Sequence, residues 1–349
     1  MIEPKVYKEE KTLTKSAIPV TLISGFLGAG KTTLLNHLFK TVDHLRFAVI
    51  ENEFGYCGID GLLISKSNQL LFELTDGCIC CTVQEELVET FKTLIRRRHE
   101  FDHIIIETTG LAEPSPILKL FDLPWMMKSF FLNGVVTVVD THYFSDSLNE
   151  SHACQEQVIY ADLLIMNKID EIQESKKINV ENQLRQLNPL AQIIQTSYSK
   201  LNVDLLLSLR SHKSQLKQDV CTHSHKEDHS DSKSLLSSDT HHHVHPHHTH
   251  SFDSVSVECT GVMEIRKLDL WLGRLARNTQ IGLLRMKGVI AIPNDPRRFI
   301  FQGVRNTLDV WPDRLWESET KKNQIVFIGR NLQQETLQNE FVSCLAELN

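Results

Sequence analysis

The stretch Pro19 to Thr33, PVTLISGFLGAGKTT, decides the fold of this 349-residue chain. Val20 to Ser24 form a short apolar run typical of a buried strand, and the residues from Thr33 onward continue as a helix. Between them, Gly25 to Thr32 match the pattern G-x-x-x-x-G-K-[ST]. A strand, a glycine-rich loop and a helix in this order predict a loop whose backbone N–H groups surround a phosphate chain.

The residue types in this loop have separate predicted roles. The glycines let the backbone curl without a Cβ in the way, and the helix N-terminus adds partial positive charge. Lys31 is expected to reach the β- and γ-phosphates, and the Thr32 hydroxyl is expected to hold Mg²⁺. A plain glycine-rich turn between a strand and a helix is the alternative. The predicted phosphate-binding residues are Gly25, Gly28, Ala29, Gly30, Lys31, Thr32 and Thr33.

The composition is globular, 41% hydrophobic with a net charge of −7, and the length suffices for two domains with their own cores. The basic cluster Arg96–Arg98 ends a helical pattern, where cations complement the helix dipole, so we expect no nucleic-acid partner. No apolar run reaches membrane-spanning length, and the polar N-terminal segment has no signal-peptide core. These features predict a cytoplasmic protein with no membrane partner.

Apolar segments alternate with amphipathic helical patterns through residues 18–211. This alternation predicts an α/β fold of the P-loop NTPase type, with a mostly parallel sheet flanked by helices and polar residues just past the strand ends. The predicted strands are 20–24, 46–50, 70–74, 103–106, 134–139, 161–166 and 192–195.

The rest of the chain divides by composition. Residues 1–17 are expected to be a disordered lead-in. Ten of the seventeen histidines lie between His223 and His250, within a Ser- and Asp-rich stretch that predicts a low-complexity linker over 212–253. Residues 254–349 show the order strand, helix, several strands, helix, which predicts a smaller α+β domain. The strands predicted after its first helix are 288–292, 299–304 and 325–328.

A guanine-binding motif follows a later strand, in the sequence Asn167-Lys168-Ile169-Asp170. The Asp170 carboxylate is suited to accept hydrogen bonds from guanine N1–H and N2–H, whereas adenine would leave it unpaired, and unpaired buried groups give strong discrimination. Lys168 is expected to cover the base with its alkyl stem, and Asn167 to tie this loop to the phosphate loop. Residues 196–200 are expected to add further base contacts.

A second carboxylate is needed near the bound metal, and Glu107 follows the fourth predicted strand at the position where one is expected. We assign Glu107 to Mg²⁺, through a water, and the Gly110 backbone N–H to the γ-phosphate. The alternative is that Glu107 only caps the segment that follows.

Three of the eight cysteines, Cys78, Cys80 and Cys81, are packed into one tetrapeptide between a predicted strand and helix. Thiolates suit Zn²⁺, Cu⁺ or Co²⁺, and three of them leave one position open on a tetrahedral ion. Candidates for further ligands lie in the preceding acidic loop at Glu51, Glu53 and Cys57. Packed cysteines or a redox pair are the alternatives. The His-rich tract is interpreted as a flexible metal-gathering segment or, alternatively, as a solvated linker.

Together these motifs resemble the CobW-like family of P-loop GTPases, the metal-handling relatives of HypB and UreG. The resemblance rests on GFLGAGKTT, ENEFG, GCICC, ETTG and NKID in that order, and continues into RMKG and FQGV near the C-terminus. It implies a zinc-responsive GTPase metallochaperone that loads a client metalloprotein, with the CxCC cysteines as ligands. It also implies that the C-terminal domain meets the client or a second protomer. Family members commonly have Glu after ENEFG, where this chain has Tyr56 followed by Cys57.

The expected cofactors are therefore GTP, Mg²⁺ and Zn²⁺, with Co²⁺ or Ni²⁺ as alternatives. Without an obvious water-orienting Gln or Arg finger, intrinsic hydrolysis is expected to be slow, on the order of 10⁻⁴ to 10⁻² s⁻¹. A metal buffer with regulatory nucleotide binding, a cobalt chaperone for corrin synthesis and a small-metabolite kinase are the competing interpretations. Lys31, Thr32 and Glu107 are the candidate catalytic residues.

Overall fold

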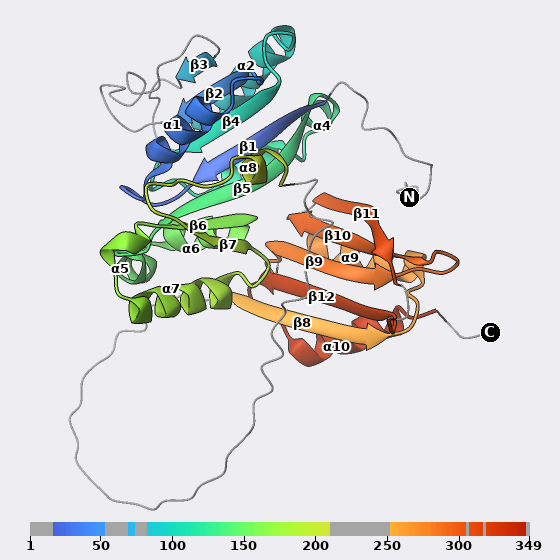
Figure 1. The fold of residues 1–349 in the computed structure, drawn as a ribbon. Coiled ribbons are helices and arrows are strands. Elements are labelled where there is room, and N and C mark those ends of the chain that lie inside the picture. The colour runs from blue at the N-terminus through green and yellow to red at the C-terminus, as the bar shows by residue number, and fades with distance from the viewer. Residues whose placement is uncertain are drawn as a thin grey trace, which may run out of the picture.

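The computed structural model describes residues 17–52, 69–73, 82–209, 252–278, 280–304, 307–316 and 319–346 (Figure 1). Nearly all of the predicted lead-in and linker lie outside the described residues. Glu53, Tyr56, Cys57 and the three cysteines of the CxCC motif lie outside them as well.

A seven-stranded sheet forms the N-terminal domain, in the order β3-β2-β4-β1-β5-β6-β7, and its strands pair in parallel throughout. This confirms the predicted parallel α/β fold, and the predicted strands differ from the observed ones mainly in their ends. The strands are β1 Ile18–Ser24, β2 Phe47–Asn52, β3 Gln69–Glu73, β4 His103–Thr108, β5 Phe130–Asp140, β6 Leu163–Asn167 and β7 Gln192–Gln195.

Helices cover both faces of this sheet (Figure 1). Helices α1 and α8 pack on one face, and α2 to α7 contribute to the apolar clusters on the other. Because both faces are buried, the strands are apolar at consecutive positions rather than alternate ones. The helices are α1 Lys31–Thr41, α2 Thr82–Arg96, α3 Ser115–Leu120, α4 Pro124–Ser129, α5 Phe144–Glu150, α6 His152–Tyr160, α7 Glu174–Leu187, α8 Asp204–Leu207 and the 3₁₀ turn η1 Ile169–Glu171.

The C-terminal domain is a five-stranded antiparallel sheet in the order β11-β10-β9-β12-β8, with α9 and α10 packed against it around the buried Trp271. The sequence analysis did not place β11 as a strand, and Pro312 explains why. Proline lacks a ladder donor and is tolerated on an edge strand, which β11 is. The elements are β8 Asp253–Thr260, α9 Ile265–Arg277, β9 Arg285–Ala291, β10 Arg297–Val304, β11 Thr307–Leu315, β12 Lys322–Gly329 and α10 Gln334–Ser343.

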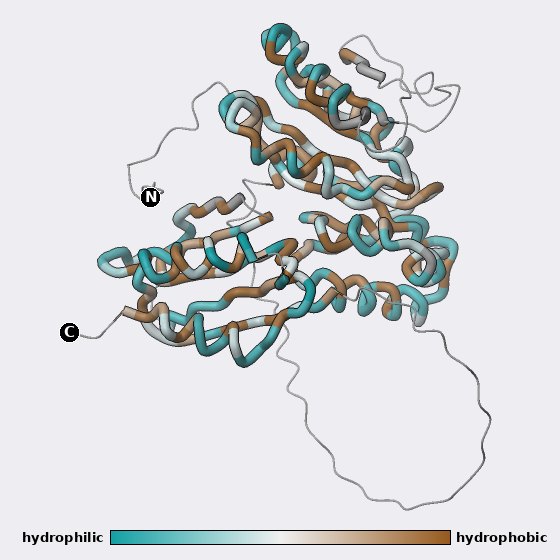
Figure 2. Tube along the Cα trace, turned by 180° about the vertical axis from the view of Figure 1, so that it is seen from behind, coloured by the Kyte–Doolittle hydropathy of each residue, from teal (hydrophilic) through white to brown (hydrophobic). Residues whose placement is uncertain are grey.

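Helix patterning follows the usual division between core and solvent. Figure 2 shows hydrophilic and hydrophobic residues alternating along the helices turn by turn. Helix α9 begins where the Glu264 carboxylate accepts hydrogen bonds from the backbone N–H groups of Arg266 and Lys267. None of the helices within the described ranges is long and apolar enough to cross a membrane.

The two domains share part of one core, which the sequence analysis did not anticipate. Leu284 and Ile328 of the C-terminal domain join the apolar cluster beneath the parallel sheet. Beside them, the fully buried Arg285 donates hydrogen bonds to the carboxylate of Asp162 and to the carbonyl of Tyr160, at the end of α6. The domain interface is therefore anchored by a buried ion pair within apolar surroundings.

Removing one partner of this pair should destabilise the protein. Arg285→Ala leaves the buried Asp162 carboxylate without its cation, a change that costs about 3–5 kcal/mol in comparable buried pairs. Denaturant unfolding of the full chain should show this loss in the transition that involves the interface. The matched control is Lys322→Ala, which breaks an ion pair to Glu258 with both side chains 55% exposed and should cost at most about 1 kcal/mol. Equal effects from the two substitutions would contradict the anchoring role of Arg285.

A buried histidine at the start of β4 makes the stability pH-dependent. His103 is hydrogen-bonded to the Thr21 hydroxyl at 2.8 Å, and Asn133 donates to the same hydroxyl at 2.9 Å. Burial lowers the pKa of His103 to about 4. In the unfolded chain His103 therefore binds a proton below pH 6.5, whereas in the folded chain it stays neutral down to about pH 4.

Acidification from pH 6.5 to 4 should consequently lower the free energy of unfolding, by up to about 3 kcal/mol from this residue. The measurement is urea unfolding at several pH values in this range. In His103→Gln, the free energy of unfolding should depend less steeply on pH than in the parent protein. The exposed His44→Gln should leave it unchanged, and an unchanged slope in His103→Gln would refute the assignment.

Candidate functional site

The phosphate loop occupies the end of β1 and the start of α1. Gly25, Gly28 and Gly30 have positive φ angles of 141°, 74° and 109°. At Gly25 a Cβ atom would lie 2.2 Å from the Val138 carbonyl oxygen of the neighbouring strand. Glycine is therefore required there both by the backbone conformation and by the close approach of β5.

The start of α1 suits an anion. Its first turn contains no acidic residue, so nothing opposes the partial positive charge of the helix N-terminus. The Lys31 ammonium group is largely buried and donates to the carbonyl of Gly25 at 2.8 Å, across the mouth of its own loop. Thr32 is half-buried and Thr33 is exposed. These are the positions from which a lysine and a hydroxyl would meet phosphates and Mg²⁺.

Glu107 and Gly110 lie beside this loop, and the roles predicted for them toward Mg²⁺ and the γ-phosphate stay predictions. Glu107 is in register with Ile23 of β1 and with Glu51 of β2, which places the two glutamates next to each other on neighbouring strands. A Cβ at Gly110 would lie 2.4 Å from the Leu27 backbone nitrogen. The segment after β4 therefore packs directly against the phosphate loop.

A helix side chain that the sequence analysis missed fixes this segment. The Gln157 amide on α6 donates to the carbonyls of Gly110 at 3.1 Å and Ala112 at 3.0 Å. Gln157 is buried. A glutamine inside a helix carries no recognisable motif, so no signal in the sequence points to this role.

The Asn167 side chain joins three loops, including the phosphate loop. Its amide donates to the carbonyl of Ala29 at 2.9 Å, which agrees with the predicted link between the two motifs. Its oxygen accepts hydrogen bonds from the Ser199 backbone N–H at 2.8 Å and the Thr196 hydroxyl at 3.2 Å. The Ser199 hydroxyl in turn donates to the carbonyl of Gly30 at 3.2 Å. Thr196 and Ser199 thus contact Asn167 and the phosphate loop, and the base contacts expected from residues 196–200 stay a prediction.

Lys168 and Asp170, the other two polar residues of the predicted guanine motif, directly follow β6 at the turn η1. Lys168 has a left-handed backbone (φ 62°), and its ammonium group pairs with the Asp140 carboxylate at 2.7 Å. Asp140 ends β5 and received no role in the sequence analysis, although its position after a strand marks it as a site residue. The hydrogen bond from Ser197 lowers the pKa of Asp170, which lies exposed on the turn η1. Asp170 is thus an ionised acceptor that faces solvent.

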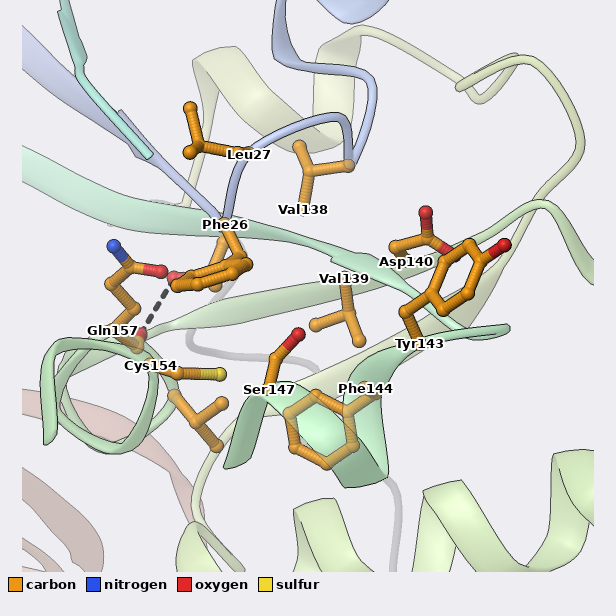
Figure 3. Close-up of a pocket in the computed structure, with 12 residues that line it drawn as sticks. Phe26, Leu27, Val138, Val139, Asp140, Tyr143, Phe144, Ser147, Cys154 and Gln157 are labelled. Atoms are coloured by element: carbon orange, nitrogen blue, oxygen red, sulfur yellow. Dashed lines mark hydrogen bonds between the residues drawn. The ribbon is translucent and has the colours of Figure 1, made fainter. Parts of the chain in front are cut away.

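A small, mainly apolar pocket lies beneath the phosphate loop (Figure 3). Phe26 covers it from the loop, and the Cys154 thiol and Ser147 hydroxyl point into it from α6 and α5. Burial raises the pKa of Cys154 to about 12, so the thiol is protonated and packs as an apolar group. Phe26 packs against the apolar cluster beside this pocket and so anchors the phosphate loop.

Of the predicted metal ligands, Glu51 is described and is buried at 6% exposure. Its neighbour in register, Glu107, comes from the strand adjacent to β1. Glu53, Cys78, Cys80 and Cys81 lie outside the described residues, so their assignment stays a prediction.

Comparisons with known proteins show the family to which the chain belongs. Residues 19–195 match the CobW/HypB/UreG nucleotide-binding domain, and residues 252–345 match the C-terminal domain of the cobalamin synthesis protein cobW. The chain therefore belongs to the CobW/HypB/UreG family and is a P-loop GTPase that uses GTP with Mg²⁺.

Several relatives are similar over nearly their whole length. A protein named zinc chaperone CobW from Pseudomonas aeruginosa is 34% identical over 96% of this chain and 93% of its own. Zinc-regulated GTPase metalloprotein activator 1 from Schizosaccharomyces pombe is 31% identical over 91% of this chain and 84% of its own. The crystal structure of Zn(II)-bound YjiA GTPase from Escherichia coli is similar at a TM-score of 0.66 and 26% identity, covering 95% of this chain and 99% of that one.

Asp170→Asn should convert the base specificity of the site. The amide can accept only one of the two hydrogen bonds that guanine offers, so GTP affinity should fall about a hundredfold, equivalent to about 3 kcal/mol. Xanthosine triphosphate should bind the variant better than GTP, because its C2 carries a carbonyl oxygen, to which the Asn amide can donate, in place of the guanine amino group. Competition against a fluorescent guanine nucleotide measures both affinities. Glu171→Gln on the same turn is the control, and unchanged GTP affinity in Asp170→Asn would remove Asp170 from the base site.

Proposed function

We propose that this GTPase is a metallochaperone that carries Zn²⁺ on Cys78, Cys80 and Cys81 and passes it to a client metalloprotein. Two relatives support zinc as the cargo through their names. The relative at 34% identity is named zinc chaperone, and the one at 31% identity is named zinc-regulated GTPase metalloprotein activator. Three closely spaced thiolates suit a borderline-soft ion and leave a position through which it can be transferred.

One observation supports coupling between nucleotide and cargo more than any other. The ends of four strands are aligned in register, with Glu73 beside Glu51, Glu51 beside Glu107, and Glu107 beside Ile23. Three strand spacings separate Glu73 from Ile23, about 14 Å. The chain thus leaves β3 toward the cysteines at the same sheet edge where β1 leads into the phosphate loop.

Glu51 and Glu107 provide a physical route between the two sites. Thr32 and Glu107 would hold Mg²⁺, which supplies charge neutralisation on the β- and γ-phosphates when it is bound. Glu51, and Glu53 beyond it, would serve as additional ligands of the cargo ion. Because Glu51 and Glu107 are neighbours, a change of charge at one carboxylate alters the field at the other, so nucleotide state and metal affinity are linked.

The client, a possible homodimer and a cytoplasmic location belong to the same proposal. A cluster of reduced thiols requires a reducing compartment, which supports the cytoplasm.

A metal buffer with regulatory nucleotide binding is disfavoured by the intact set Lys31, Thr32 and Glu107. Co²⁺ or Ni²⁺ as cargo, including cobalt for corrin synthesis, is distinguished from Zn²⁺ by affinity measurements on the same protein.

Phosphate release with and without Zn²⁺ tests the proposal. The apo protein should turn over GTP slowly, on the order of 10⁻⁴ to 10⁻² s⁻¹, and saturating Zn²⁺ should change this rate severalfold. Cys80→Ser should lower Zn²⁺ affinity at least tenfold and abolish the response while GTP affinity of the apo protein stays the same.

Cys259→Ser is the matched control, because this half-buried cysteine of the C-terminal domain lies outside the proposed site. It should bind Zn²⁺ and respond to it as the parent does. Equal Zn²⁺ affinity in Cys80→Ser and the parent would move the cargo site elsewhere. A parent protein that binds Zn²⁺ with no change in phosphate release would favour the buffer.

A further inference from the structure

A cluster of three metal-ligating side chains lies at the domain interface, apart from the nucleotide site and the CxCC motif. Glu113 follows the Gly110 segment, and His152 and Glu156 lie one helical turn apart on the same face of α6. Their ligand atoms all lie within 4.8 Å of one another. Glu113 and His152 are partly exposed, at 45% and 40% of their side chains, whereas Glu156 is buried.

The hydrogen bonds of His152 define its protonation. Arg330, which follows β12 in the C-terminal domain, lies 2.9 Å from Nε2 of His152 through its Nη2 atom. An arginine only donates, so Nε2 must be the accepting nitrogen of a neutral ring. The proton is therefore on Nδ1, which donates to the Glu113 carboxylate at 3.1 Å.

This geometry matches that of two ligands of one ion. At tetrahedral angles, bonds of 2.0–2.2 Å from an imidazole nitrogen and a carboxylate oxygen to a shared Zn²⁺ place those two atoms roughly 3.4 Å apart, close to the 3.1 Å between Nδ1 and the Glu113 carboxylate. An ion can thus replace the proton between Nδ1 and Glu113 with little movement, and Glu156 is close enough to become the third ligand. One imidazole and two carboxylates suit Zn²⁺ and neighbouring divalent transition metals, and their two negative charges balance the ion.

We propose that Glu113, His152 and Glu156 form a second divalent-metal site, and that metal binding there excludes the contact between His152 and Arg330. When Nδ1 binds the ion, the neutral ring carries its proton on Nε2. Two donors, Nε2–H and the guanidinium, then face each other and their hydrogen bond is lost. Arg330 keeps its contact over the Phe252 ring, at 4.6 Å.

The consequence is a metal-controlled contact between the domains. In the metal-free protein, Arg330 links the C-terminal domain to the first turn of α6. In the metal-bound protein, α6 and the Gly110 segment are joined to each other by the ion, and Arg330 is released. The inference is independent of the proposed cargo site, because it uses none of the CxCC cysteines.

The test therefore uses the full chain with Cys78→Ser, Cys80→Ser and Cys81→Ser, titrated with ZnCl₂. Hydrogen–deuterium exchange at the imidazole C2 position, read by mass spectrometry of peptides, reports each histidine separately and resolves His152 from the His-rich tract. Zn²⁺ should slow exchange at His152 at least fivefold. Exchange at His44, an exposed histidine beside the single carboxylate of Asp43, should not change in the same titration.

Two variants in the same background give opposite shifts. Glu156→Gln removes a charged ligand and should raise the Zn²⁺ concentration at the midpoint at least tenfold. Arg330→Met removes a competing cation and should lower that midpoint severalfold, a result that a purely structural role for Arg330 does not produce. Unchanged exchange at His152 on adding Zn²⁺ would overturn the site. A midpoint in Arg330→Met that equals or exceeds that of its parent would overturn the exclusion.

Discussion

The nucleotide site depends on one buried carboxamide. Asn167 uses its amide and its oxygen at once, and so fixes the distance between the phosphate loop, the end of β6 and the loop after β7. Inside the protein each of these hydrogen bonds is hard to replace with water, because the side chain is 2% exposed. The phosphate loop and the loops that follow β6 and β7 are therefore held in a fixed relation before any nucleotide arrives, which lowers the ordering cost of binding.

The parallel domain was predictable from the sequence because its signals are local. A strand before a glycine-rich loop and a helix after it allow few local structures other than a phosphate loop. Apolar strands between amphipathic helices require a sheet buried on both faces. The link from Asn167 to the phosphate loop followed from the same logic. Asp140 was visible as the polar end of a strand, but its pairing with Lys168 depends on which strands become neighbours.

The domain interface was not predictable, because its contacts join residues that are far apart in the sequence. Gln157 and Asp162 belong to no motif, and RMKG, which begins at Arg285, gives no indication of its partner. Each of these side chains acts through a partner that lies far away in the chain. Leu284 and Ile328 were expected in a separate core because hydrophobic patterning identifies buried residues without telling which core they join. Edge strand β11 was missed because the proline it contains is a feature that usually argues against a strand.

The C-terminal domain contacts helix α6 at both ends of the helix, and one contact is buried whereas the other is exposed. At its C-terminal end, Arg285 is enclosed with Asp162 and the Tyr160 carbonyl, so loss of either charge would leave the other buried without its counter-ion. At its N-terminal end, the contact of Arg330 with His152 is open to solvent and easily exchanged. Loss of the exposed contact alone therefore leaves the C-terminal domain attached, because the enclosed pair of Arg285 and Asp162 and the shared apolar cluster around Leu284 and Ile328 do not depend on it.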